Sequence, residues 1–169
     1  WAPSDGVAIR QGHHIEWHNP SSAVRTEGEL VGEVAYVWSD FRDDGDRDVY
    51  LQVITPEGEF KFEENGIVIV NAPDRQEEPV VHPCSDGGWI IAWEDYHIFN
   101  PFRGQGIGRN DIYCSKVDAW GERLWGGDEF MSTVSIFLSS KENLSIVGDG
   151  NGGCIITWND NRAGPSSDI

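Results

Sequence analysis

The sequence predicts an all-β fold made of about three repeated four-stranded units, and three observations support this prediction. The chain of 169 residues contains 20 Gly and 8 Pro together with 8 Trp, 7 Phe and 4 Tyr. Frequent Gly and Pro among bulky apolar residues is typical of many short strands joined by tight turns. The second observation is a repeated motif, and the third is a strand that is apolar on both faces.

The repeated motif is an apolar run that ends in Trp-x-Asp, with its tryptophan at Trp38, Trp93 and Trp158. The first two tryptophans are 55 positions apart and the last two are 65 apart. The difference reflects an inserted loop at 96–108 in the middle unit. Self-similarity at a nearly fixed period is the signature of a repeat architecture.

A second motif, Asp-(Ile/Val)-Tyr, follows each run, at Asp48 and at Asp111, and the first two residues of the motif recur at 168–169. Agreement of both motifs divides the chain into successive units. We assign them to residues 1–62, 63–125 with the inserted loop 96–108, and 126–169, of which the last is incomplete.

Each unit is expected to contain four strands, as the middle unit illustrates. A first strand at 78–82 ends in a Gly-rich turn at 85–88, and the apolar tryptophan run forms the second strand. The third strand starts at Asp111, and a turn at 118–121 leads to the fourth. These are ordinary hairpin signals. Residues 132–147 are assigned to strands by their place in the unit.

The second strand of the middle unit, residues 89–93, presents Trp, Ile and Trp on one face and Ile and Ala on the other. A sheet with one face open to water would alternate apolar and polar residues, so this strand is expected to be covered on both sides. We expect the same of the strands that carry Trp38 and Trp158. Stacked propeller blades supply that environment.

The predicted fold is therefore β-propeller-like, with about three four-stranded blades. A closed propeller needs roughly four to eight blades, so the chain is expected to be a partial propeller or a fragment of a larger one. Further blades of the same chain, or self-assembly of several copies, would complete it.

The run Gly-Gly-Trp-Ile-Ile-Ala-Trp93, followed by Asp-Ile-Tyr113, resembles the units of a family of bacterial secreted repeat proteins. Those units read Gly-Gly-hydrophobic-Ala-Trp-x-Asp-x-Arg…Asp-Ile-Tyr-Ala-Gln. The resemblance covers nearly the whole chain, although His97 stands where the other units carry Arg42 and Arg162. The resemblance implies a propeller-like protein of the cell surface, associated with sorting domains, and an extracellular location.

Charge narrows the class of partner. The formal net charge is −17, and such a surface repels phosphate backbones, which excludes nucleic acid. No segment reaches the roughly 20 apolar residues of a transmembrane helix. The expected partners are a protein or a glycan at the cell surface. Cys84, Cys114 and Cys154 form at most one internal disulfide, and free buried thiols are the alternative.

One set of charged residues recurs in the units. We interpret it as a structural brace, in which Arg–carboxylate pairs hold the loop between the second and third strands. The alternative is a repeated ligand or cation site. The set consists of Asp40, Arg42, Asp48, Asp95, Asp111, Asp160, Arg162 and Asp168.

Two stretches could bind metal ions. Asp44, Asp46 and Asp48 stand at alternate positions on a Gly-containing turn, and Ca²⁺ takes about six to eight oxygen ligands. Calcium is thus the one cofactor that the sequence suggests, with a solvated acidic turn as the alternative. In the second stretch His14, Glu16 and His18 would share one face of a strand and could bind a transition metal. A polar strand packed beside a neighbouring blade is the alternative there.

The inserted loop is the candidate recognition surface, because long loops on a rigid scaffold commonly carry binding function. The loop is rich in aromatic residues and includes an arginine. Its candidate binding residues are Tyr96, His97, Phe99, Phe102 and Arg103.

No nucleophile elbow, phosphate loop or dinucleotide fingerprint is present in the sequence. We therefore predict a non-catalytic extracellular or cell-surface scaffold and interaction module rather than an enzyme. Two alternatives remain open: a calcium-dependent, lectin-like propeller that binds glycans, and a fragment of a secreted glycan-active hydrolase.

Overall fold

The computed structural model describes residues 8–9, 18–42, 45–96, 110–125, 131–137 and 139–162. The described residues form three antiparallel sheets and no helix, which confirms the all-β prediction. The strands of the first sheet are β1 (His18–Val24), β2 (Val34–Asp40), β3 (Asp48–Ile54) and β4 (Ile67–Val70). Those of the second are β5 (Gln76–Pro83), β6 (Trp89–Asp95), β7 (Asp111–Val117) and β8 (Ser132–Ser135). The third sheet is a hairpin of β9 (Lys141–Gly148) and β10 (Cys154–Asp160).

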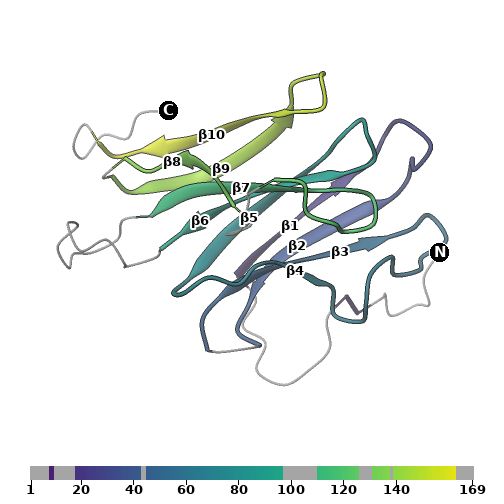
Figure 1. The fold of residues 1–169 in the computed structure, drawn as a ribbon, viewed down its shortest axis with the longest axis horizontal. Coiled ribbons are helices and arrows are strands. Elements are labelled where there is room, and N and C mark those ends of the chain that lie inside the picture. Colours follow the sequence, from purple (N-terminus) through teal and green to yellow (C-terminus); the bar gives the residue numbers. More distant parts are fainter. Residues whose placement is uncertain are drawn as a thin grey trace.

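In the first two sheets each strand pairs with the next strand of the chain (Figure 1). Their central ladders have the same register: Trp38 lies opposite Tyr50, and Trp93 lies opposite Tyr113. The third sheet repeats only the first hairpin of this pattern among the described residues. Three sheets of four, four and two strands therefore follow one topology.

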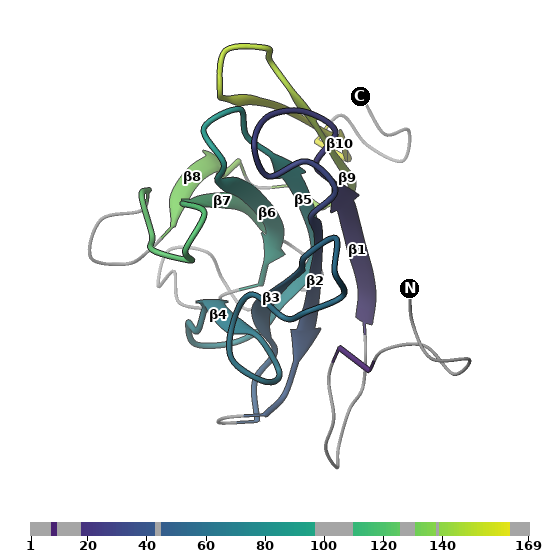
Figure 2. The ribbon, with the colours of Figure 1, turned by 90° about the vertical axis from the view of Figure 1, so that its right-hand side faces the viewer.

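The sheets pack face to face, with the first strands β1, β5 and β9 in successive contact. The first and second sheets diverge from β1 and β5 toward β4 and β8 (Figure 2). One apolar cluster fills the space between them, because it joins Ala35 and Val37 of β2 to Trp89, Ile91 and Trp93 of β6. The alternating side chains of two sheets thus form one core.

Burial of the second strands differs between the sheets. All seven residues of β6 are buried, so the prediction of a strand covered on both faces is confirmed there. The prediction is wrong for β10, where Trp158 is half-buried and Ile155 is 55% exposed. The reason is tertiary: β5 and β6 pack against β9, and among the described residues no sheet lies on the far side of β9 and β10.

The first two sheets extend past the unit boundaries expected at 62 and 125. After β3 the chain forms a turn at 55–58 and an isolated bridge between Ile54 and Phe60. It continues through a loop and enters the sheet again only at β4. In the second sheet an isolated bridge between Val117 and Arg123 likewise lies between β7 and β8 in the sequence. The fourth strands therefore do not follow directly on the turns at 55–58 and 118–121.

Candidate interaction surface

Two of the residues assigned to the brace, Asp40 and Arg42, contact each other at the end of β2. The indole Nε1 of Trp38 donates a hydrogen bond to Asp40 Oδ2 at 3.3 Å, and Arg42 donates from Nε at 3.1 Å and from Nη2 at 2.8 Å. Arg42 also lies 3.6 Å over the Tyr50 ring and donates from Nη1 to the Asn65 carbonyl at 2.8 Å. The contact reaches the loop before β4 rather than the loop between β2 and β3.

The same arrangement recurs in part in the other sheets. Trp93 Nε1 donates to Asp95 Oδ2 at 3.4 Å; His97, the next position of the pattern, lies outside the described residues. In the third sheet Arg162 forms an ion pair with Asp160. The hydrogen bonds and ion pair with Arg162 hold the pKa of Asp160 well below its usual range. Asp168 also lies outside the described residues.

The aspartates that begin the third strands face those that end the second strands. Asp48 lies opposite Asp40 and Asp111 lies opposite Asp95, and all four are buried. Asp111 Oδ1 is 3.6 Å from the Nζ of Lys141 in β9. These positions belong to the interior of the sheets, which supports the structural interpretation of the brace.

The predicted metal sites are only partly described. Asp44, His14 and Glu16 lie outside the described residues, and of His18 only the backbone is described, at the start of β1. Asp46 Oδ2 accepts a hydrogen bond from the Asp74 amide at 3.2 Å. Within the described part of the chain, no group of three His, Cys, Asp or Glu residues is placed to hold a metal ion. Calcium binding therefore stays a prediction.

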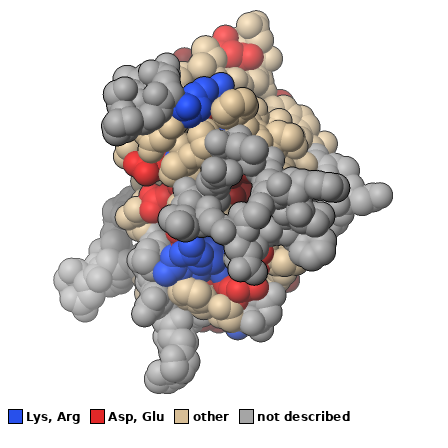
Figure 3. Space-filling model, turned by 90° about the vertical axis from the view of Figure 1, so that its left-hand side faces the viewer, with Lys and Arg blue, Asp and Glu red and all other residues tan. Residues whose placement is uncertain are grey.

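Of the candidate binding loop only Tyr96 is described; His97, Phe99, Phe102 and Arg103 are not. Tyr96 turns back onto its own strand, because its hydroxyl donates to Glu94 Oε2 at 3.1 Å. Burial and the neighbouring Glu94 raise the pKa of Tyr96. Figure 3 shows this end of the sheets, where acidic side chains lie between two groups of basic side chains.

Glu94 is a buried charged group that the sequence analysis missed. It is 2% exposed, and burial, with contributions from Glu78 and Glu142, raises its pKa to about 7. Asn110 Nδ2 donates to Glu94 Oε2 at 2.6 Å. The sequence contains one sign that Glu94 is unusual. It is charged at the sixth position of the second strand, where the other units carry the uncharged Ser39 and Asn159.

Neighbouring sheets are joined at equivalent junctions. The residue before each third strand contacts the first residue of the next sheet. The amide of Gln76 donates to the Arg47 carbonyl at 2.7 Å. The amide of Lys141 donates to Asn110 Oδ1 at 2.7 Å, and Lys141 Nζ donates to the Asn110 carbonyl at 2.7 Å.

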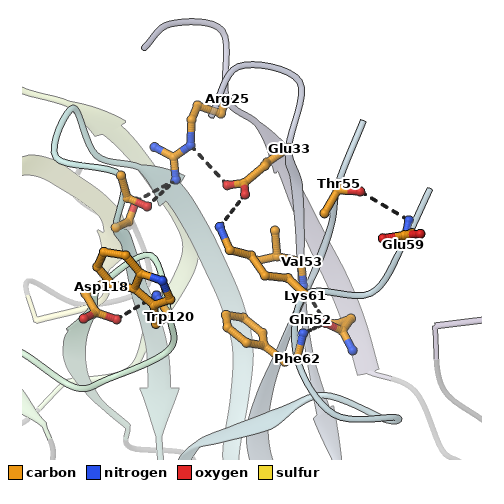
Figure 4. A network of polar contacts seen from close by, with 12 residues as sticks. Arg25, Glu33, Gln52, Val53, Thr55, Glu59, Lys61, Phe62, Asp118 and Trp120 are labelled. Atoms are coloured by element: carbon orange, nitrogen blue, oxygen red, sulfur yellow. Dashed lines mark hydrogen bonds and ion pairs between the residues drawn. The ribbon is translucent and has the colours of Figure 1, made fainter. Parts of the chain in front are cut away.

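A second connection between sheets centres on Arg25, after β1 (Figure 4). Its guanidinium donates to the carbonyls of Cys84 and Gly87, both at 2.7 Å, in the turn between β5 and β6. It pairs with Glu33 at 3.5 Å, and Glu33 accepts a hydrogen bond from Lys61. A cation of the first sheet thus holds the turn of the second.

Beside this connection, a cavity of about 530 Å³ lies between the turns that begin β2, β6 and β10. It is lined by residues within 25–28, 82–85 and 148–153. Burial lowers the pKa of His82 in its wall and raises that of Cys84 to about 11, so both side chains are neutral at neutral pH. Cys84, Cys114 and Cys154 are all free thiols. The thiol of Cys84 in the cavity wall is therefore not a thiolate nucleophile.

The outer face of the third sheet exposes an apolar side chain from each of its two strands. The second residue of the second strand is Ala35 in the first sheet, Ile90 in the second sheet and Ile155 in the third sheet. The first two are fully buried by the next sheet, whereas Ile155 is 55% exposed. Val147, its cross-strand partner, is 53% exposed. We call this pair and the exposed Thr157 the third-sheet face.

In the described residues no helix is long and apolar enough to cross a membrane. Comparison of the chain with protein-family models, with curated proteins and with solved structures yields no match.

Proposed function

We propose that this chain is a non-catalytic scaffold module of an extracellular or cell-surface protein, with the stacked arrangement of a partial propeller. It interacts with other proteins by extending its stack of sheets. The single observation that carries the proposal is the third-sheet face, in which Ile155 and Thr157 are exposed whereas the residues at the same positions of β2 and β6 are buried.

The charged residues support a scaffold rather than an enzyme. Asp40 pairs with an arginine two positions later and accepts a hydrogen bond from a tryptophan two positions earlier, and Asp160 also pairs with an arginine two positions later. The Nζ of Lys141 donates hydrogen bonds to the backbone carbonyls of Asn110 and Phe137. Repeated use of one contact in successive units is expected of scaffolding, because function is usually placed at one site.

The partner that fits the third-sheet face is another sheet with an apolar face, since sheets pack through interdigitating side chains. For the isolated chain a second copy supplies that sheet. Two copies that pair through Val147 and Ile155 would bury the same residues on both sides, as expected of a two-fold interface.

Sedimentation velocity over a range of protein concentrations tests this proposal. The native chain is expected to associate reversibly, and Ile155→Lys is expected to weaken association at least ten-fold, since a charge would be buried without a partner. Val31→Lys is the matched control, because Val31 is 52% exposed and lies outside the strands. A native chain that stays monomeric at every concentration overturns the proposal.

A second measurement addresses catalysis. The chain is expected to release no product from a panel of glycans, with or without calcium. Turnover that disappears on substitution of a single carboxylate would replace the scaffold with a hydrolase. Calcium-dependent binding on a glycan array would replace it with the lectin-like alternative.

A further inference from the structure

Strand β10 has a neighbour on one side only in the part of the chain that the structure describes. In the complete sheets, β2 and β6 each have a neighbour on both sides: β1 and β3, and β5 and β7. Among the described residues β10 is paired with β9 alone. Unpaired N–H and C=O groups along a strand form a template for another strand.

The two complete sheets show which strand fits such an edge and in what register. β3 and β7 both read Asp-(Val/Ile)-Tyr-x-x-x-(Ile/Val). In both ladders seven consecutive pairs form without a bulge, with Asp opposite Asp and Tyr opposite Trp. β10 has the same seven-residue length and ends in the same Trp-x-Asp. Its Asp160 and Trp158 therefore match an incoming Asp and Tyr.

In the first unit the second strand and the residues just after it supply the Asp–Arg pair of the brace. The same pair is already formed at the end of β10. Asp160 pairs with Arg162 as Asp40 pairs with Arg42. In the first sheet that arginine lies over the tyrosine of the third strand, at 3.6 Å. Arg162 now lies 4.5 Å from the ring centroid of Phe137, which shows that it can stack on an aromatic ring.

We infer that the edge of β10 binds an extended segment of another polypeptide that carries Asp-(Ile/Val)-Tyr-x-x-x-(Ile/Val), in antiparallel register with its Asp opposite Asp160. Backbone hydrogen bonds supply affinity in this mode of strand addition, and pockets for alternate side chains supply specificity. The inference rests on the proposed interaction function and names its partner, but it uses the strand edge rather than the third-sheet face.

The probe is a synthetic peptide with the sequence of residues 47–55, acetylated and amidated, whose binding is measured by fluorescence anisotropy. Saturable binding is expected. A peptide of the same composition with Asp and Tyr exchanged in position is expected to bind at least ten-fold more weakly. Arg162→Ala should weaken binding about five- to ten-fold, because it removes the stacking cation. Arg75→Ala is the control and should leave binding unchanged.

Amide hydrogen exchange then locates the peptide. Exchange is expected to slow at residues 154–160 on binding and to stay unchanged at the outer strands β4 and β8. The inference is overturned if binding is absent, if both peptides bind equally, or if protection falls on β4 or β8.

The same titration on Ile155→Lys separates the two proposals. Retained peptide binding without self-association supports both, because the edge and the face are then independent surfaces. Self-association of the native chain without peptide binding removes the inference and leaves the proposed function. Peptide binding by a native chain that never self-associates removes the proposed function and leaves the inference.

Discussion

At the scale of single residues, the Trp-x-Asp-x-Arg pattern has a direct physical explanation. Residues two apart on a strand share a face, so the indole N–H of Trp38 reaches the carboxylate of Asp40. Arg42, just beyond the strand, completes the contact and neutralises the charge. A buried tryptophan needs an acceptor and a buried carboxylate needs donors, and this spacing satisfies both.

Substitution of Arg42 tests the brace. Asp40 is 1% exposed, so Arg42→Ala leaves a buried carboxylate without its cation and is expected to destabilise the fold by about 3 kcal/mol. Urea unfolding measures the change. Arg75→Ala, which removes an arginine with 52% of its side chain exposed, should cost less than about 1 kcal/mol. Equal effects of the two substitutions would contradict the structural interpretation.

Glu94 differs from Asp40 in its surroundings. The groups that act on its carboxyl are an amide, a phenol and two carboxylates rather than a cation. Tyr96 and Asn110 donate to it, whereas Glu78 of β5 and Glu142 of β9 raise its pKa together with burial. Glu77, opposite it in the ladder, pairs with arginines instead. The proton is thus held more tightly in the folded chain than in the unfolded chain.

The stability of the fold is therefore expected to depend on Glu94 and pH. The pKa rises from 4.5 to about 7, so the contribution of the neutral form is fully present below about pH 4.5 and is lost as the pH rises through 7. Glu94→Gln should match the native chain near pH 5 and be more stable by about 2 kcal/mol at pH 8. Urea unfolding across this range measures it, with the exposed Glu57→Gln as control. Parallel pH profiles would rule the effect out.

At the scale of the elements, the first strands share a bulge. Asn19, Glu78 and Asn143 have φ values of 39°, 52° and 59°, and each follows the residue that pairs with the sixth position of the second strand. A bulge re-aims side chains and increases local twist. Its recurrence at one position in three sheets places Asn19 beside Glu78, to whose carboxylate it donates.

The bulge of β9 can be tested without disturbing buried contacts, because Asn143 is exposed. Asn143→Val is expected to destabilise the chain by about 1–2 kcal/mol, since a β-branched residue tolerates positive φ poorly. Asn143→Gly should change stability by less than about 0.5 kcal/mol. Thermal unfolding of the two variants checks the order, and a valine that is as stable as glycine would contradict it.

At the scale of the molecule, stability depends on how each sheet is held to the next. Lys141 is fully buried at the start of β9, and its Nζ donates to the carbonyls of Asn110 at 2.7 Å and of Phe137 at 2.6 Å. Arg25 holds the first two sheets together in a comparable way, through turn carbonyls. Both cations donate hydrogen bonds to backbone carbonyls that the stacking of the sheets removes from water.

Lys141→Met is expected to loosen the third sheet specifically. The substitution keeps an unbranched side chain but removes a donor from the carbonyls of Asn110, Phe137 and Ser139 and the ion pair with Asp111, at a cost of about 3 kcal/mol. Hydrogen exchange should accelerate in β9 and β10 while β1–β3 stay protected. Lys61→Met, a matched change in the first sheet, should not affect β9 and β10. Uniform acceleration throughout the chain would mean that the third sheet has no stability of its own.

Much of this architecture could be predicted from local pattern. The second strands, the turns at 85–88 and 118–121 and the contact between Asp40 and Arg42 depend on residues close in sequence, whose spacing determines which face they share. Glu94 could not be identified as a buried acid, because its environment comes from β5, β9 and Asn110. The exposed third-sheet face could not be predicted either, because Ile155 occupies the position in its strand that the buried Ala35 and Ile90 occupy in theirs.

The sequence by itself determined that the chain is all-β, that its strands repeat, and that tryptophan and aspartate stand two positions apart at the end of each second strand, with an arginine after the first and the third. These properties follow from alternation along a strand and from turn chemistry, which act over a few residues. Only the tertiary structure decided which faces are covered, that Glu94 holds its proton near neutral pH, and that β10 pairs with β9 alone among the described residues. Burial and charge proximity are set by neighbours distant in the chain, which local spacing does not specify.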